Sequence, residues 1–247
     1  DSVNGICVRA IDTLVFSSKG LQQMHLPNTI EKFNYRCFYN NPGLNNIDLR
    51  QFTNLINIGT SAFASTANRL ILPPNNNPNF FNWVAEEEYG AYYEPGDTLE
   101  NKQFGYKAIF THTLTSADTE IDSNGKINSC TADINNKAVI IPEQINGITV
   151  NAFKEYLFYE NEAYSFIFPS TVQYFFRGSF SNSANPTFDL SNCINLRFIG
   201  PNAFKVFNTE RHLILPEISN EHFMGWRDGK GNYHNQLDFE IADTTYY

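Results

Sequence analysis

An internal repeat of roughly 25 residues constrains the fold of this chain more than any other feature of the sequence. Each copy begins with three residues of apolar, strand-like character and continues with an aliphatic residue and then an aromatic residue. The triplets occupy residues 24–26, 47–49, 70–72, 139–141, 166–168, 188–190 and 213–215, and all except 47–49 and 188–190 are followed by proline. The aromatic positions Phe38 and Phe63 are 25 residues apart, and Phe180 and Phe204 are 24 apart. A unit of this length cannot bury its apolar face alone, so neighbouring copies must stack to form a common core.

A larger duplication lies over the repeat and divides the chain into two modules. The matching pairs are Leu49 with Leu190 and Phe63 with Phe204 at an offset of 141, Pro27 with Pro169 and Phe38 with Phe180 at 142, and Trp83 with Trp226 at 143. Small loop insertions explain the drift of two residues. We therefore predict a first module at 1–105 that ends in a Trp-containing cap. A second module at 106–247 has an N-terminal hairpin, signalled by Asn124-Gly125, and its own Trp-containing cap.

The charge balance excludes several classes of partner. The chain has 17 Lys and Arg against 26 Asp and Glu, a formal net charge of −9. Nucleic acids and anionic membranes both require a basic surface, so we expect neither as a partner. No apolar run approaches the roughly 20 residues that cross a bilayer, so we expect no membrane insertion by this segment.

The four cysteines do not have the spacing of a metal site. Cys7, Cys37, Cys130 and Cys193 form no CxxC pair. Free cysteine is among the most buried residue types, so small buried thiols are the favoured interpretation, and a disulfide between Cys7 and Cys130 stays open.

Four segments resemble BspA-type leucine-rich repeats. They are NLINIGTSAF (54–63), NLRFIGPNAF (195–204), IFPSTVQYFFRGSF (167–180) and IIPEQINGITVNAF (140–153). The resemblance covers most of 20–75 and 138–216 and implies a β-rich repeat fold, a leucine-rich-repeat solenoid of two duplicated modules with flanking β-hairpins. We expect the triplets to form one strand layer, irregular or 3₁₀ segments to form the back, and hairpins at roughly 109–137, 83–100 and 226–241. The resemblance also implies a cell-surface or secreted protein, since members of the family in bacteria and some protozoa are of this kind and are implicated in adhesion.

The strand triplets predict which side chains could bind a partner. Alternation along a strand directs Met24, Leu26, Leu70, Leu72, Phe166, Phe168, Leu213 and Leu215 inward. The candidate binding residues on the opposite face are Ile71, Ile140, Ile167, Ile214, His25, His212, Asp48 and Asp189. An exposed apolar stripe of this kind tends to mark an interaction site. Two other interpretations remain open: a neighbouring loop covers the stripe, or β-branched residues simply suit strands.

The sequence offers no arrangement typical of catalysis or of a cofactor. The five histidines fall in neither an HExxH nor a GxSxG context, and no Walker or GxGxxG loop is present. Residues 120–131 partly imitate a calcium-binding loop, but Thr131 stands where its bidentate Glu belongs, so the hairpin interpretation is favoured. Trp83 and Trp226 are predicted to cap the last repeat of each module. We expect no enzymatic activity, no metal and no cofactor.

Three hypotheses about function follow. The first is an extracellular or cell-surface adhesin whose repeat surface binds a protein or glycan on host or neighbouring cells. The second is a structural spacer or lattice unit of a surface protein. The third is an accessory domain of a larger surface enzyme.

Overall fold

Very short strands, stacked in register, form the framework of the chain. The computed structural model describes residues 2–3, 5–66, 69–86, 92–99, 103–183, 187–205, 212–217, 226–227, 233–234 and 238–240. At residues 2–3, 212, 227, 233–234 and 238–240 it describes the backbone alone. The described residues contain strands and turns but no helix. The chain divides into two compact units, Asp1–Phe110 and Thr111–Tyr247.

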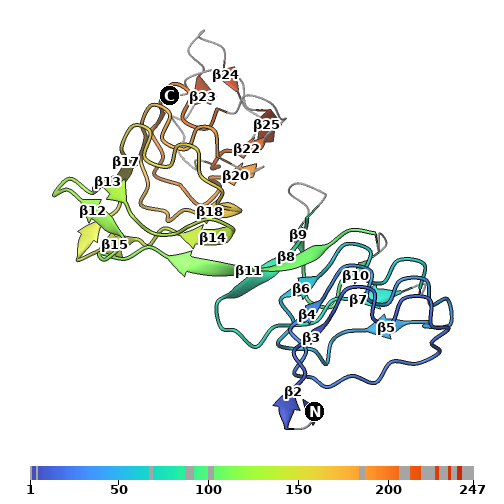
Figure 1. Cartoon of the computed structure of the whole chain (residues 1–247). Coiled ribbons are helices and arrows are strands. Elements are labelled where there is room, and N and C mark those ends of the chain that lie inside the picture. The colour runs from blue at the N-terminus through green and yellow to red at the C-terminus, as the bar shows by residue number, and fades with distance from the viewer. Residues whose placement is uncertain are drawn as a thin grey trace. The chain divides into compact units, whose positions relative to one another are not determined.

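The first unit carries two strand ladders, which Figure 1 shows on two sides of a coiled chain. The triplet ladder contains β5 (Ile47–Asp48), β7 (Leu70–Ile71) and β10 (Thr98–Leu99). The second ladder contains β3 (Ala10–Ile11), β4 (Lys32–Phe33), β6 (Asn57–Ile58) and β11 (Tyr106–Thr113), with β8 (Phe80–Ala85) and β9 (Tyr92–Tyr93) beside β11. Its parallel register aligns Ile11, Phe33 and Ile58 as successive Cα partners. A hairpin of β1 (Ser2–Val3) and β2 (Ile6–Cys7) precedes the coil.

The second unit repeats this plan. Its triplet strands are β14 (Lys137–Ile140), paired in parallel with β18 (Ser165–Ile167), and β20 (Thr187–Asp189), paired in parallel with β22 (His212–Ile214), beyond which lies β25 (Asp238–Glu240). Its second ladder is β12 (Thr119–Ile121), β13 (Lys126–Cys130), β17 (Ala152–Phe153), β19 (Tyr174–Phe175) and β21 (Phe198–Ile199). Two hairpins complete the unit: β15 (Gln144–Ile145) with β16 (Ile148–Thr149), and β23 (Trp226–Arg227) with β24 (Tyr233–His234).

The expected solenoid is confirmed, and so is a hairpin in each of the three predicted regions, β12–β13, β8–β9 and β23–β24. Two details of the prediction are wrong. The back of each turn carries the second ladder in place of irregular or 3₁₀ segments, and residues 24–26 form no strand. The second ladder escaped prediction because the strands that its repeat turns contribute, β4, β6, β17, β19 and β21, are only two residues long, too short to show alternation.

Glycine allows the turns of the coil to approach closely on the second ladder. The Gly59 N–H donates to the Phe33 carbonyl at 2.6 Å, and the Gly200 N–H donates to the Phe175 carbonyl at 2.6 Å. A Cβ atom on Gly59 would lie 2.8 Å from the Asn34 carbonyl carbon. The same Ile-Gly pair therefore recurs in both modules because a side chain at this position would force neighbouring turns apart.

Phenylalanine rings fill the space between the ladders of each unit. In the second unit, Phe180 is fully buried, with its ring centroid 4.8–5.9 Å from seven others. Those rings belong to Phe153, Phe158, Phe166, Phe168, Phe175, Phe188 and Phe204. In the first unit, the equivalent Phe38 stacks on Phe16 at 5.2 Å and on Phe63 at 5.4 Å. Offset and edge-to-face contacts of this kind add stability beyond the area that the rings bury.

The predicted inward residues are buried or packed against the core. Leu70, Leu72, Phe166, Phe168, Leu213 and Leu215 are at most 4 % exposed, and Met24 and Leu26 are partly buried against the first core. Trp83 and Trp226 are 0 % and 2 % exposed, and the Trp83 indole N–H donates to the Pro73 carbonyl at 2.9 Å. Both tryptophans therefore belong to the cores of their units. The side chain of Tyr233, a neighbour of Trp226 in the second cap sequence, lies outside the described residues.

The cysteines are free thiols. Cys37 and Cys193 are fully buried, as predicted, whereas Cys130 is partly buried and Cys7 is exposed, so the prediction of a buried thiol is wrong for Cys7. Cys7 is the second residue of the two-residue strand β2 in the amino-terminal hairpin, and neither residue of β2 belongs to the packed core. Burial raises the pKa of the Cys37 and Cys193 thiols to about 12.

We expect Phe180→Ala to destabilise the second unit by about 3–5 kcal/mol, because it removes the ring on which the stack converges. Tyr159 is 44 % exposed, so Tyr159→Ala is the matched control and should change stability by less than about 1 kcal/mol. Urea denaturation followed by circular dichroism measures both. Equal effects of the two substitutions would contradict a core that depends on the stack.

We also expect Cys7 to react first with a thiol reagent at pH 8. Cys37 and Cys193 should react only after unfolding, because their thiols are buried and hold their protons far above this pH. Counting reactive thiols before and after denaturation checks this, and Cys7→Ser should remove the fastest phase. Fast labelling of Cys37 or Cys193 in the folded protein would contradict the described core.

Candidate binding surface

In the first unit, the predicted binding residues lie on strands with unequal exposure. Asp48 and Ile71 are Cα partners on β5 and β7, and Thr98 on β10 is the next partner of Ile71. Asp48 is exposed, but Ile71 is only 8 % exposed. In this ladder β7 has a paired neighbour on each side, whereas β5 is an edge strand. Ile71 is therefore not part of an exposed stripe.

An ion pair fixes the Asp48 carboxylate. Arg50 donates from Nε at 3.0 Å to both carboxylate oxygens and from its second guanidinium nitrogen at 2.6 Å to Oδ2. The Arg50 backbone N–H also donates to Oδ1 at 3.0 Å. The hydrogen bonds from Arg50 lower the pKa of Asp48, so its carboxylate is ionised at neutral pH. Both side chains are well exposed, so the pair orients Asp48 more than it stabilises the fold.

His25 lies away from the strands of the triplet ladder. The segment 22–27 has no hydrogen-bonded strand partner among the described residues, and the His25 side chain is exposed. Between this segment and β5 lies a hollow of about 410 Å³, lined by Gln22, Gln23, Met24, His25, Leu44, Asn45, Asn46, Ile47, Asp48 and Gln51. The structure therefore brings His25 and Asp48 to one hollow, whereas the sequence placed them on a continuous strand face.

In the second unit, the predicted isoleucines are half-buried. Ile140 and Ile167 are direct Cα partners on β14 and β18. Asp189 is exposed and is the Cα partner of Ile214, which is also half-buried. The backbone of His212 is in β22, next to Thr187, and its side chain lies outside the described residues. This face consequently presents two adjacent isoleucines, with a third beside a carboxylate.

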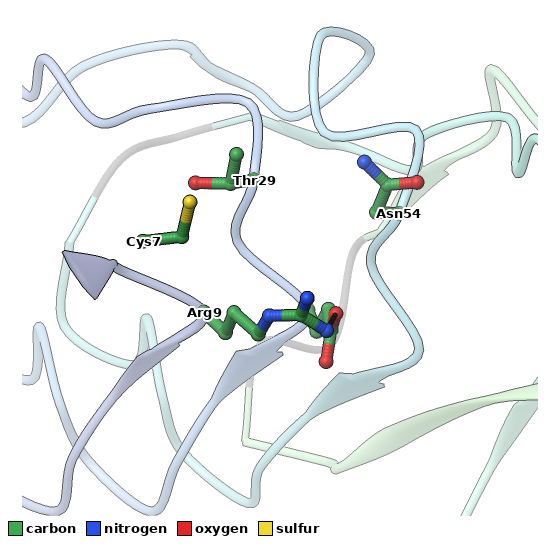
Figure 2. Close-up of a pocket in the computed structure, with 5 residues that line it drawn as sticks. Cys7, Arg9, Thr29 and Asn54 are labelled. Atoms are coloured by element: carbon green, nitrogen blue, oxygen red, sulfur yellow. Dashed lines mark hydrogen bonds and ion pairs between the residues drawn. The ribbon is translucent and has the colours of Figure 1, made fainter. Parts of the chain in front are cut away.

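A second hollow, of about 280 Å³, lies near the amino-terminal hairpin and was not predicted (Figure 2). It is lined by Cys7, Arg9, Thr29, Glu31 and Asn54. Arg9 donates to Glu31 at 2.7 Å, and Thr29 donates to the Val8 carbonyl at 2.7 Å. Arg9 and Glu31 thus pair with each other, Thr29 is bonded to the backbone, and the Cys7 thiol has no base among the lining residues other than the paired Glu31. The hollow shows no nucleophile–base pair.

The residues of the calcium-like stretch build a turn. Asp122 Oδ1 accepts the backbone N–H groups of Asn124 at 2.9 Å and Lys126 at 3.2 Å, and Oδ2 accepts Asn128 Nδ2 at 3.2 Å. These bonds close the hairpin of β12 and β13, as predicted. In the part of the chain that the structure describes, no group of three His, Cys, Asp or Glu side chains is placed to hold a metal ion.

One histidine pairs with a carboxylate. His112 Nε2 lies 3.3 Å from Asp118 Oδ2, and the same oxygen accepts the Thr115 N–H at 2.9 Å and the Thr115 hydroxyl at 2.8 Å. Hydrogen bonding by Thr115 lowers the pKa of Asp118. Asp118 thus holds the turn at 115–118, so we interpret its contacts with Thr115 and His112 as structural.

Within the described ranges, no helix is long and apolar enough to span a membrane.

Comparison with known proteins agrees with this architecture. The family model described as "BspA type Leucine rich repeat region" matches residues 6–82 and 128–225, in six copies. No match was found among the curated proteins or among the solved structures.

We expect Ile71→Ser to lower the free energy of unfolding by about 3 kcal/mol, because it removes a buried side chain and buries a hydroxyl. Ile167→Ser, at a half-buried position, should cost only about 1 kcal/mol. Chemical denaturation of the two variants measures the difference. A larger loss for Ile167→Ser would contradict the exposures described for these strands.

Proposed function

Because the chain belongs to the BspA-type leucine-rich-repeat family, we propose that it is a non-catalytic, extracellular or cell-surface adhesin. Its repeat surface binds a macromolecule on host or neighbouring cells. Stacked repeats hold outward side chains in a fixed array, and their common use is an extended binding surface. Adhesion requires no cofactor and no acid–base pair.

One observation carries this proposal: the in-register isoleucines of the second unit. Ile140 and Ile167 remain half-exposed on adjacent strands, although their neighbours Val139 and Phe166 are almost fully buried. A pair of partly exposed β-branched side chains on a rigid sheet supplies an apolar contact without a loss of backbone freedom on binding. Asp189 and Ile214 extend the same kind of surface with a charge. These four residues are the strand-face site.

Binding of the purified chain to immobilised extracellular-matrix proteins and to whole cells tests the proposal. The test variant is Ile140→Ser/Ile167→Ser, and the matched control is Tyr156→Ser/Tyr159→Ser, which changes two exposed side chains on a turn of the same unit. We expect saturable binding that weakens roughly tenfold or more in the isoleucine variant and persists in the tyrosine variant.

Circular dichroism and the melting temperature establish that each variant is folded before binding is compared. Binding that survives in the isoleucine variant and fails in the tyrosine variant would move the site to the turns. An absence of binding to every surface would overturn the adhesin and favour the structural spacer.

A further inference from the structure

The hollow of the first unit exists because one triplet does not pair. Residues 24–26 have the sequence of a strand triplet, yet β5 pairs with β7 on one side only. The about 410 Å³ between segment 22–25 and β5 falls within the roughly 300–1,000 Å³ of typical ligand pockets. It is an open recess at the edge of the triplet ladder.

A buried asparagine fixes one wall of this hollow. Asn41 is fully buried, and its Oδ1 accepts the N–H groups of Lys19 and Leu21, each at 3.1 Å. Its Nδ2 donates to the Phe16 and Phe38 carbonyls, each at 2.8 Å. The backbone immediately before Gln22 and Gln23 is therefore anchored to the core, so the wall is preformed.

The lining residues provide both the hydrogen-bond donors and the acceptors that sugar hydroxyl groups require. Five exposed carboxamides line the hollow, those of Gln22, Gln23, Asn45, Asn46 and Gln51. Each carboxamide both donates and accepts, as does each hydroxyl group of a sugar. Met24 is half-buried and supplies an apolar surface for the C–H face of a sugar ring, while Leu44 and Ile47, also among the lining residues, are only 3 % and 5 % exposed. The combination of an apolar floor with a few polar groups is usual for small-molecule sites.

The charge of the lining selects among sugars. Asp48 is the one carboxylate among the lining residues, and neither lysine nor arginine is among them. The guanidinium of Arg50 is engaged by Asp48 through three hydrogen bonds. An acidic sugar would meet a negative charge here without a cation to offset it, whereas a neutral sugar can donate hydroxyl hydrogen bonds to Asp48.

The internal duplication shows that the fold does not need three of these carboxamides. The second module keeps the strand and its turn: Asp189 accepts the Ser191 N–H at 2.8 Å, as Asp48 accepts the Arg50 N–H at 3.0 Å. At the matching offsets, however, Gln22, Gln23 and Asn46 are replaced by Tyr164, Ser165 and Thr187. The same framework therefore folds with other residues at three of the five carboxamide positions, whereas Gln51 matches another carboxamide, Asn192.

We propose that this hollow binds one neutral sugar residue, a hexose or an N-acetylhexosamine, of a cell-surface glycan. The inference rests on the proposed function and deepens it, because it assigns a ligand class to His25 and Asp48, which the strand-face site of the second unit does not include. Asp48 and the carboxamides bind the hydroxyl groups, and Met24 contacts the ring.

The test is titration of the full chain with the methyl glycosides of mannose, galactose and N-acetylglucosamine, with sialic acid as the acidic comparison. Saturation-transfer NMR detects the contact and calorimetry gives the affinity. We expect millimolar or tighter binding of at least one neutral glycoside and none of sialic acid.

Two variants locate the site. Asn45→Ala/Gln51→Ala should weaken binding roughly tenfold, since it removes two carboxamides that donate and accept hydrogen bonds. Gly43→Ala should also weaken it, because the new Cβ would lie 2.6 Å from Gln22 Cδ and displace that flexible side chain. Asn192→Ala, the counterpart of Gln51 in the second module, is the control and should bind as the unchanged chain does.

Three results would overturn the inference: no contact with any of the neutral glycosides, a preference for sialic acid, or equal binding by Asn45→Ala/Gln51→Ala. Binding of cells by the same preparations separates this outcome from the proposed function. Cell binding without glycoside binding rejects the sugar site and leaves the adhesin intact, whereas loss of both rejects the adhesin as well.

Discussion

The stacking of phenylalanine rings between two strand ladders is the interaction on which the rest of this structure depends. A two-residue strand forms too few hydrogen bonds to fix which residues of its neighbour it pairs with, so side-chain packing must fix this register. Phe180 does this in the second unit, where rings from neighbouring turns meet it on several sides. Phe38 has the same place in the first unit, between Phe16 and Phe63. Because each ring contacts rings above and below, a shift of one turn would break several contacts at once.

The stack also determines which side chains remain available to a partner. Gly59 and Gly200 let neighbouring turns of the coil come close enough for the rings to meet. Their backbone N–H groups hold this close approach through hydrogen bonds to the neighbouring strand. Strand alternation then directs Val139 and Phe166 into the core and leaves Ile140 and Ile167 partly exposed. The packing of the rings therefore makes the strand face rigid. The side chains that this face offers to a partner are the alternate strand residues that do not enter the core. Function can differ between the two units while the fold stays the same.

The sequence predicted the core well because burial leaves a periodic signal. The inward residues of the triplets and the hairpin at Asn124-Gly125 follow from alternation and turn chemistry. Pairing and exposure were harder to predict. Residues 24–26 look like their counterparts, but Asn41 holds the preceding segment to the core, and the strand does not form. The triplet pattern does not distinguish Ile71, which is buried, from Ile140 and Ile214, which are only half-buried. The carboxamides of the hollow converge from segments whose proximity no local pattern encodes.

The central claim is that this chain binds through its strand faces and the hollow at their edge, and not through its turns. Photo-crosslinking on cells tests it most directly, with a photoreactive residue at Gln51 or Asp189 on the strand side, or at Tyr156 on a turn; all three positions are exposed. We expect covalent adducts to a cell-surface molecule from Gln51 or Asp189 and none from Tyr156. Adducts from Tyr156 alone would contradict it.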